Sequence, residues 1–273
     1  MKAKWIITAG LVALCGMAQA AFVTIGNAGN LDDTTGYGAV AYEYNISSTE
    51  VTIAEFQASG ASIGTANENY WSAVGTAAPA SYVSLYEAMR YCNYLNGDVN
   101  SGYYSSSDGG VTYTANALSH DAYAAANGLT YFVPTEDEWY KAAYYDASGA
   151  GGYSLYANGT STAPVAGTDA NYGGSTAWVV GTGTEEQNGT DDMMGNVWEW
   201  MENSAGVIRG GSYGASEANL RSSNRGGGSP SAEVIVVGFR PVEVVPEPAT
   251  MGLLVIGGAI VFLSRLKRRF YSL

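Results

Sequence analysis

Between residues 21 and 245 the apolar residues occur in short runs, and clusters of Gly, Ser and Asn interrupt them throughout. Segments 39–46 and 234–237 have the composition of strands. The chain has 36 glycines in 273 residues, nearly twice the usual share of about 7%. With 47% hydrophobic and 12% aromatic residues it can still bury a core. We therefore expect one α+β domain, rich in irregular loops.

Two segments have the pattern of amphipathic helices. In segment 83–95 the apolar side chains recur at spacings of four and three, at Leu85, Met89, Cys92 and Leu95. Ser84 and Glu87 form a capping-box pattern at its start. Cys92 lies on the apolar stripe, which predicts a small core residue rather than a reactive thiol.

The second predicted helix is segment 134–145. Thr135 is the expected N-cap, and three acidic residues follow it, Glu136, Asp137 and Glu138. Carboxylates are favourable at the positive end of a helix. We therefore interpret them as capping residues rather than as an acid–base pair.

The charge distribution excludes one class of partner. Six of the 12 basic residues and one of the 25 acidic residues lie outside 21–245, which leaves six basic against 24 acidic residues and a net charge of −18 there. Phosphate backbones are bound by clustered Lys and Arg. Nucleic-acid binding is therefore not expected, whereas cation binding is electrostatically favourable.

Histidine and cysteine are too scarce for several kinds of active site. His120 is the single histidine, so a histidine-rich zinc or iron site cannot form. We expect His120 to be a solvated loop residue, not part of a Ser-His-Asp triad. The sequence contains no nucleophile elbow, phosphate-binding loop or dinucleotide fingerprint.

Residues 1–20 have the three parts of a secretory signal peptide. Basic residues come first, an apolar run from Trp5 to Met17 follows, and Ala18-Gln19-Ala20 has the pattern of a cleavage site. Signal peptidase would remove this segment together with Cys15, leaving Cys92 as the only cysteine.

Residues 243–273 have the pattern of a short membrane anchor. Fifteen mostly apolar residues, Ala249 to Leu263, precede a basic cluster that ends at Arg269. As a helix they span about 22 Å, so they form a marginal single transmembrane helix with a cytoplasmic basic end. With Pro246-Glu247-Pro248 before it, this tail resembles the PEP-CTERM sorting signal of Gram-negative bacteria. The resemblance implies export, inner-membrane anchoring, removal of the tail by an exosortase, and delivery to the cell surface or extracellular matrix.

Four motifs occur in a fixed order along the remaining chain. Together they resemble the formylglycine-generating enzyme family (the sulfatase-modifying-factor domain) over residues 21–242. The motifs are Tyr44–Thr52, Phe132–Trp139, Asp192–Trp200, and Arg209–Tyr213, with Gly238-Phe239-Arg240 closing the domain.

This resemblance implies a C-type-lectin-like fold with little regular secondary structure. Gly195, Gly210 and Gly211 would then adopt backbone conformations closed to other residues. Trp198 and Trp200 would supply buried area. Arg209 and Arg240 would pair with carboxylates or backbone carbonyls in the core.

The resemblance also implies a structural calcium site. The matching ligand positions are Asp192, Gly195, Val197 and Glu199, which offer carboxylate and carbonyl oxygens. The alternative is a turn held by hydrogen bonds alone. A second family site near Asn171 lacks a recognisable downstream aspartate.

The family's copper site, by contrast, is not expected. Family enzymes oxidise a substrate cysteine with copper(I) held by two cysteines after Arg-Gly-Gly-Ser, and copper(I) requires such soft ligands. Here Ala215 stands about where the first thiolate would be, and residues 213–221 contain no cysteine.

The favoured function is therefore an exported binding module stabilised by calcium. Its candidate ligand-binding residues lie in the polar segment after Ser212, and they are Tyr213, Glu217, Asn219, Arg221 and Arg225. Their aromatic, amide and charged groups suit an exopolysaccharide or a peptide. Arg221 and Arg225 could equally be structural.

Two alternatives remain. One is an enzyme of the formylglycine-generating or nonheme-metal oxidase superfamily with chemistry that needs no cysteine, or a hydrolase using Asp191 and Asp192. The other is a purely structural module that spaces or decorates the matrix.

Overall fold

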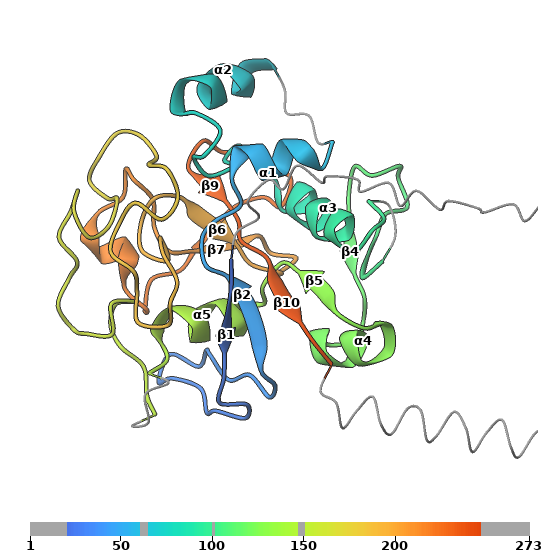
Figure 1. The fold of residues 1–273 in the computed structure, drawn as a ribbon, viewed down its shortest axis with the longest axis horizontal. Helices are drawn as coiled ribbons and strands as arrows, with labels where there is room; N and C mark the ends of the chain where they lie inside the picture. Colours follow the sequence, from blue (N-terminus) through green and yellow to red (C-terminus); the bar gives the residue numbers. More distant parts are fainter. Residues whose placement is uncertain (1–20, 61–64, 100–101, 147–150, 247–273) are drawn as a thin grey trace, which may run out of the picture.

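Two small four-stranded sheets organise the domain (Figure 1). The computed structural model describes residues 21–60, 65–99, 102–146 and 151–246. In the first sheet the strand order is β1, β2, β10, β5, and all neighbours are antiparallel. These strands are β1 (Phe22–Ile25), β2 (Tyr44–Ser47), β10 (Val242–Val244) and β5 (Thr130–Phe132). The sheet therefore joins both ends of the described chain to its middle.

The second sheet has the order β8, β7, β6, β9. Its strands are β8 (Gly226–Gly227), β7 (Val207–Arg209), β6 (Trp198–Trp200) and β9 (Val237–Gly238). β6 pairs with β9 in parallel, whereas the other pairs are antiparallel. A separate hairpin pairs β3 (Tyr104–Ser105) with β4 (Thr114–Ala115).

The two predicted helices are present. They are α3 (Leu85–Leu95) and α5 (Glu136–Tyr144), and both begin with a capping box, Ser84 with Glu87 and Thr135 with Glu138. Cys92 is fully buried in α3, as expected, and burial raises the pKa of its thiol. Three further helices were not predicted, namely α1 (Ile53–Ala58), α2 (Thr65–Val74) and α4 (His120–Asn127), together with a 3-10 turn, η1 (Glu217–Leu220).

Irregular backbone makes up much of the rest. Between α5 and β6 the described residues form no helix or strand, only isolated bridges such as that between Asn171 and Gly195 (Figure 1). Gly195 has φ +92°, and a Cβ there would lie 2.3 Å from the Asn171 carbonyl oxygen. The two predicted strand segments contribute only β2 and part of β9, because turns interrupt the remainder.

A pair of buried arginines joins the loops to the sheets. The Arg240 guanidinium donates to both oxygens of Glu199 at 2.8 Å and to the carbonyls of Ser47, Ser48 and Asp191. Arg209 forms an ion pair with Glu136 at 2.6 Å and donates to the Ser222 and Asn224 carbonyls. Both arginines thus bond to carboxylates and carbonyls, as the sequence predicted.

The two sorting segments lie outside the described residues, apart from 243–246 at the end of the domain. Within the described part of the chain, no helix is long and apolar enough to cross a membrane. The proposed transmembrane helix falls in 247–273 and the proposed signal peptide in 1–20.

Arg240→Lys tests the role of the arginine fork. A lysine ammonium cannot donate hydrogen bonds to two carboxylate oxygens and three carbonyls at once. The buried Glu199 carboxylate would therefore lose part of its hydrogen bonding. We expect a loss of about 3–5 kcal/mol in the free energy of unfolding, measured by denaturant titration. Arg221→Lys, at a half-exposed ion pair, is the control and should cost at most about 1 kcal/mol. Equal losses in both variants would contradict this role.

Candidate functional site

The turn before β6 positions Asp192 in the interior. Asp192 is 5% exposed with φ +61°, and one of its carboxylate oxygens accepts a hydrogen bond from the Gly181 amide at 2.7 Å. Burial raises its pKa to about 6. Gly195 and Val197 follow on the same turn, and the Gly195 amide donates to the Gly210 carbonyl.

Both carboxylate oxygens of Glu199 already accept hydrogen bonds, so they are not free to bind a metal ion together with Asp192. One carboxylate oxygen accepts from the Trp139 indole and from Arg240, and the other accepts from Arg240, all at 2.8 Å. The fully buried Glu199 is therefore the counter-ion of Arg240. Three of the predicted calcium ligands, Asp192, Gly195 and Val197, lie on this turn, whereas Glu199 lies in β6 and its carboxylate is bonded to Arg240.

Glu50 is the carboxylate that sequence reasoning missed. It is fully buried directly after β2, and no donor in the described residues bonds to either of its carboxylate oxygens. Burial and the nearby Asp192 charge raise its pKa well above the usual range. Its position in the first family motif, next to apolar Val51, was the sequence feature that could have indicated a buried carboxylate. Glu50 and Asp192 are thus two neighbouring buried carboxyl groups, and the raised pKa of Glu50 keeps it protonated beside Asp192.

No cluster of three or more His, Cys, Asp or Glu side chains suited to a metal ion occurs in the residues described. A cation at the Glu50–Asp192 pair would need carbonyl or amide oxygens as further ligands. Asn196 lies on the same turn, fully buried, and its side-chain oxygen already accepts from Asn171 and from the Trp178 amide. Asn171 thus supports the turn through hydrogen bonds.

The predicted ligand-binding residues have separate partners. Tyr213 is mostly buried at 7% exposure, near Tyr70 and Tyr82. Asn219 closes the capping box of η1 with Ser216. These two residues therefore have structural roles.

The charged residues of that segment are more accessible. Glu217 and Arg221 form an i,i+4 ion pair, with side chains 36% and 43% exposed, and both bond to the Tyr156 hydroxyl. Arg225, 41% exposed, pairs with Glu136. The five residues thus do not converge on one centre.

The positions expected for copper ligation hold no thiolate. Ala215 donates its amide to the Ser212 carbonyl and accepts from the Gly173 amide. Cys92 is buried in α3, on another element. The residues present do not fit the copper site of the family.

The prediction for His120 was wrong. The imidazole is 1% exposed and stacks on Phe132, with ring centroids 4.0 Å apart. Its two nitrogens lie 3.0 Å from Glu138 and 3.2 Å from Glu202. Although burial opposes its charge, these carboxylates raise the pKa of His120 to about 10. The available signal was the alanine-rich helical run after Ser119, which starts α4 at His120.

Tyrosines complete this network. The Tyr42 hydroxyl donates to Glu138, and the Tyr103 and Tyr104 hydroxyls donate to the two oxygens of Glu202. Glu138 is fully buried, whereas the Glu202 side chain is 14% exposed. His120, Glu138 and Glu202, with these three hydroxyls, are called the imidazolium network below.

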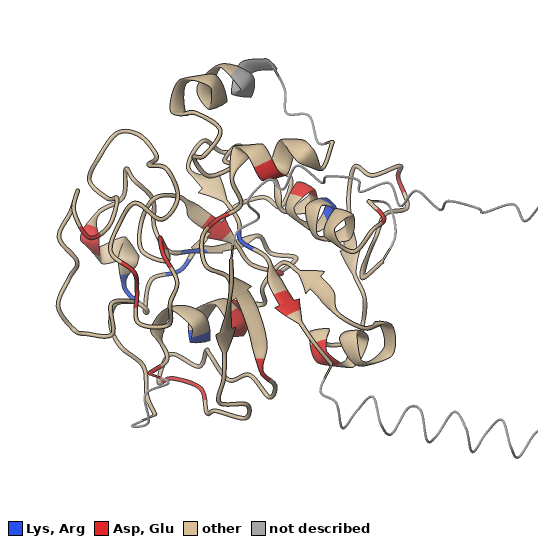
Figure 2. Cartoon of the chain, in the orientation of Figure 1, with Lys and Arg blue, Asp and Glu red and all other residues tan. Residues whose placement is uncertain are grey.

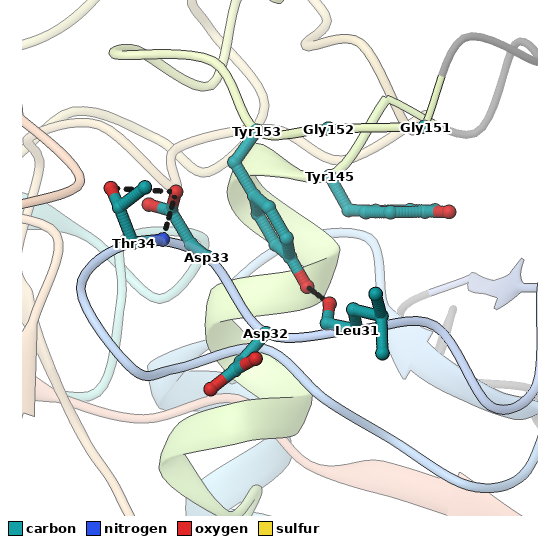
Figure 3. A pocket seen from close by; sticks show the side chains of 8 residues that line it. All are labelled: Leu31, Asp32, Asp33, Thr34, Tyr145, Gly151, Gly152 and Tyr153. Atoms are coloured by element: carbon teal, nitrogen blue, oxygen red, sulfur yellow. Dashed lines mark hydrogen bonds between the residues drawn. The ribbon is translucent and has the colours of Figure 1, made fainter.

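A cavity of about 410 Å³ lies between the loop at 31–34 and two tyrosines (Figure 3). The Tyr153 hydroxyl donates to the Leu31 carbonyl, and Asp33 accepts from Thr34 and Tyr140. Burial opposes ionisation of Asp33, but these hydrogen bonds hold its pKa below the usual value. The Asp33 carboxylate and the Tyr153 hydroxyl at this cavity are therefore already engaged in hydrogen bonds within the protein.

His120→Gln tests the imidazolium network. Removing the cation leaves two carboxylates facing each other, and breaking such a buried pair costs about 3–5 kcal/mol. Because folding raises the His120 pKa from 6.5 to about 10, its stabilisation is complete below pH 6.5 and is lost as the pH rises towards 10.

The measurement is the free energy of unfolding of both proteins at several pH values. The difference between the wild-type protein and His120→Gln should shrink steadily between pH 6.5 and 10. A difference that is independent of pH would contradict a charged His120.

The comparisons with known proteins agree with this fold. The model of the sulfatase-modifying factor enzyme 1-like domain matches residues 37–245. None of the curated proteins is significantly similar to the chain.

Solved structures with the same fold include three that cover most of the chain. Treponema denticola variable protein 1 is 23% identical, with a TM-score of 0.56 over 81% of this chain and 94% of that one. CarF is 22% identical, with a TM-score of 0.57 over 84% and 99%. PvdO from Pseudomonas aeruginosa is 19% identical, with a TM-score of 0.50 over 83% and 92%.

The family model spans most of the chain, and the buried turn, arginine pairs and irregular loops occupy its matched region. The chain therefore belongs to the sulfatase-modifying factor enzyme 1-like family, with a mixed α/β fold of the formylglycine-generating enzyme type.

Proposed function

We propose that this protein is an exported, surface- or matrix-directed binding module that uses the family scaffold without the family's copper chemistry. The observation that carries the proposal is the combination of a complete framework around Arg209 and Arg240 with Ala215 in place of a thiolate. Cys92 is buried in α3 and supplies at most one sulfur. Retaining the scaffold without these ligands favours binding over oxidation.

Export is proposed from the sorting segments. Signal peptidase would act after residue 20, and an exosortase would act on the tail at 243–273. Between these steps the short C-terminal helix would hold the protein in the inner membrane of a Gram-negative bacterium. The acidic domain would then face the outside, at the cell surface or in the matrix.

We also propose a structural calcium ion at the turn that begins at Asp192. The two adjacent buried carboxyl groups support it. Without a cation Glu50 stays protonated, as its raised pKa indicates, and a bound divalent cation would allow both groups to ionise. Calcium takes such carboxylates together with carbonyl oxygens, which Gly195 and Val197 would offer. Glu50 replaces Glu199 in this ligand set, since Glu199 serves Arg240.

Metal analysis with thermal melting tests the calcium ion. The wild-type protein should hold one calcium ion per chain and melt at a lower temperature in excess chelator. Glu50→Gln and Asp192→Asn should abolish that chelator effect. The control is Asp191→Asn, which removes an adjacent, less buried carboxylate and should retain both properties. A calcium-free wild-type protein that is insensitive to chelator would refute the site.

The proposed ligand face is centred on Tyr156, Glu217 and Arg221. The Glu217 carboxylate and the Arg221 guanidinium are partly exposed, and the Tyr156 hydroxyl, which is buried beneath them, bonds to both. The two charged groups suit the hydroxyl and charged groups of an exopolysaccharide or a peptide. Arg225 extends the face towards Glu136.

Arg221→Gln tests this face. Exposed ion pairs contribute about 1 kcal/mol or less, so the variant should fold normally. We expect its binding to matrix polysaccharide, measured by co-sedimentation, to fall at least several-fold. The control variant Arg90→Gln changes a half-buried arginine of α3 and should bind as the wild-type protein does. Unchanged binding by Arg221→Gln would argue against this face.

A further inference from the structure

A second cavity, of about 400 Å³, opens beside the start of α3. Leu85, Met89 and Pro230 form apolar walls, and Tyr86 and Tyr113 add aromatic rings. Glu202, just after β6, also lines the cavity, and its side chain is 14% exposed. Its volume lies near the lower end of the range of about 300–1,000 Å³ for small-molecule sites.

The Glu202 carboxylate is held in a fixed position. The Tyr103 hydroxyl donates to one oxygen at 3.2 Å, and the His120 imidazole lies 3.2 Å from the other, which also accepts from Tyr104. The Glu202 backbone amide donates to the Pro134 carbonyl at 2.7 Å. A carboxylate fixed in this way needs little reorganisation to bind a ligand.

The charges of the imidazolium network do not cancel. One imidazolium lies between two carboxylates, and Glu138 is completely buried while Glu202 reaches the cavity. One negative charge therefore remains, and Glu202 is the member of the network through which a ligand can reach it.

Acidic residues outnumber basic ones around the cavity. The positive charge of Arg90 lies near the Tyr113 hydroxyl, but the negative charges of Asp98 and Asp108 lie near it as well. Glu87 and Glu233 lie close together at the beginning of α3. Basic positions are few over the whole domain (Figure 2). An anionic ligand is therefore disfavoured at this cavity.

We propose that this cavity binds a primary ammonium group carried on a small ring or a short apolar chain. The ammonium would pair with Glu202, and the rings of Tyr86 and Tyr113 would favour a cation near their faces. The apolar walls would cover the ligand body. An amino sugar and an alkylamine share this chemistry. The site is separate from the proposed face at Arg221 and does not depend on it.

Calorimetric titration of the purified full-length protein tests the proposal. The probes are glucosamine and pentylamine, and glucose and pentanol are their uncharged counterparts. We expect at least one amine to bind at least tenfold more tightly than its counterpart. Binding of glucosamine alone would indicate an amino sugar as the source, and binding of pentylamine alone an alkylamine.

Variants assign the binding to this cavity. Glu202→Gln should weaken amine binding at least tenfold, whereas Glu233→Gln removes a nearby charge outside the lining and should change it less than twofold. Glu202→Gln also alters the imidazolium network, so Ser204→Arg is a second variant. Ser204 is an exposed lining residue, and an arginine there would occupy the cavity and compete for Glu202.

Three results would overturn the proposal. They are no amine binding, equal binding of amines and uncharged counterparts, and amine binding unchanged in both Glu202→Gln and a folded Ser204→Arg. Arg221→Gln should leave amine binding intact, so failure of the Arg221 face and failure of this cavity are distinguishable.

Discussion

The ion pair between Arg240 and Glu199 holds together parts of the chain that have little regular structure of their own. Arg240 lies between β9 and β10, so its backbone belongs to the connection between the two sheets. Its guanidinium bonds to β6 through Glu199, to the end of β2 through Ser47, and to the loop at Asp191. Short strands form few backbone hydrogen bonds with their neighbours. The side-chain hydrogen bonds of one planar guanidinium connect these segments instead.

The same arrangement recurs with other partners. Glu136 is paired with Arg209, and Glu138 with His120. Glu186 forms no ion pair within the described residues, but it lies near the Arg240 charge and accepts hydrogen bonds from the Met193 and Met194 amides. The pair formed by Glu50 and Asp192 differs, because the Glu50 oxygens receive no hydrogen bond from the described residues. A bound cation would remove this exception, which is why we propose calcium there.

Local signals predicted the local structure well. Capping boxes and helical spacing identified α3 and α5, and the ordered motifs predicted the family and the pairing of both arginines. The other helices were missed because α1 and α4 are short and α2 is weakly amphipathic.

The contacts that the sequence did not predict join residues that are far apart in the chain. The Glu199 carboxylate bonds to Arg240, 41 residues away, and its place in the motif did not indicate this partner. His120 is buried because Phe132, Glu138 and Glu202 converge on it from three elements, and the polar residues around it gave no indication of this contact.

We propose that this chain keeps the family scaffold without its cysteine-oxidising chemistry. Mass spectrometry of a cysteine-containing sulfatase peptide, incubated with the protein, copper(I) and oxygen, tests this claim most directly. We expect that the cysteine is not converted to formylglycine above the rate in a protein-free control. Formation of the aldehyde at a rate proportional to protein concentration would contradict it.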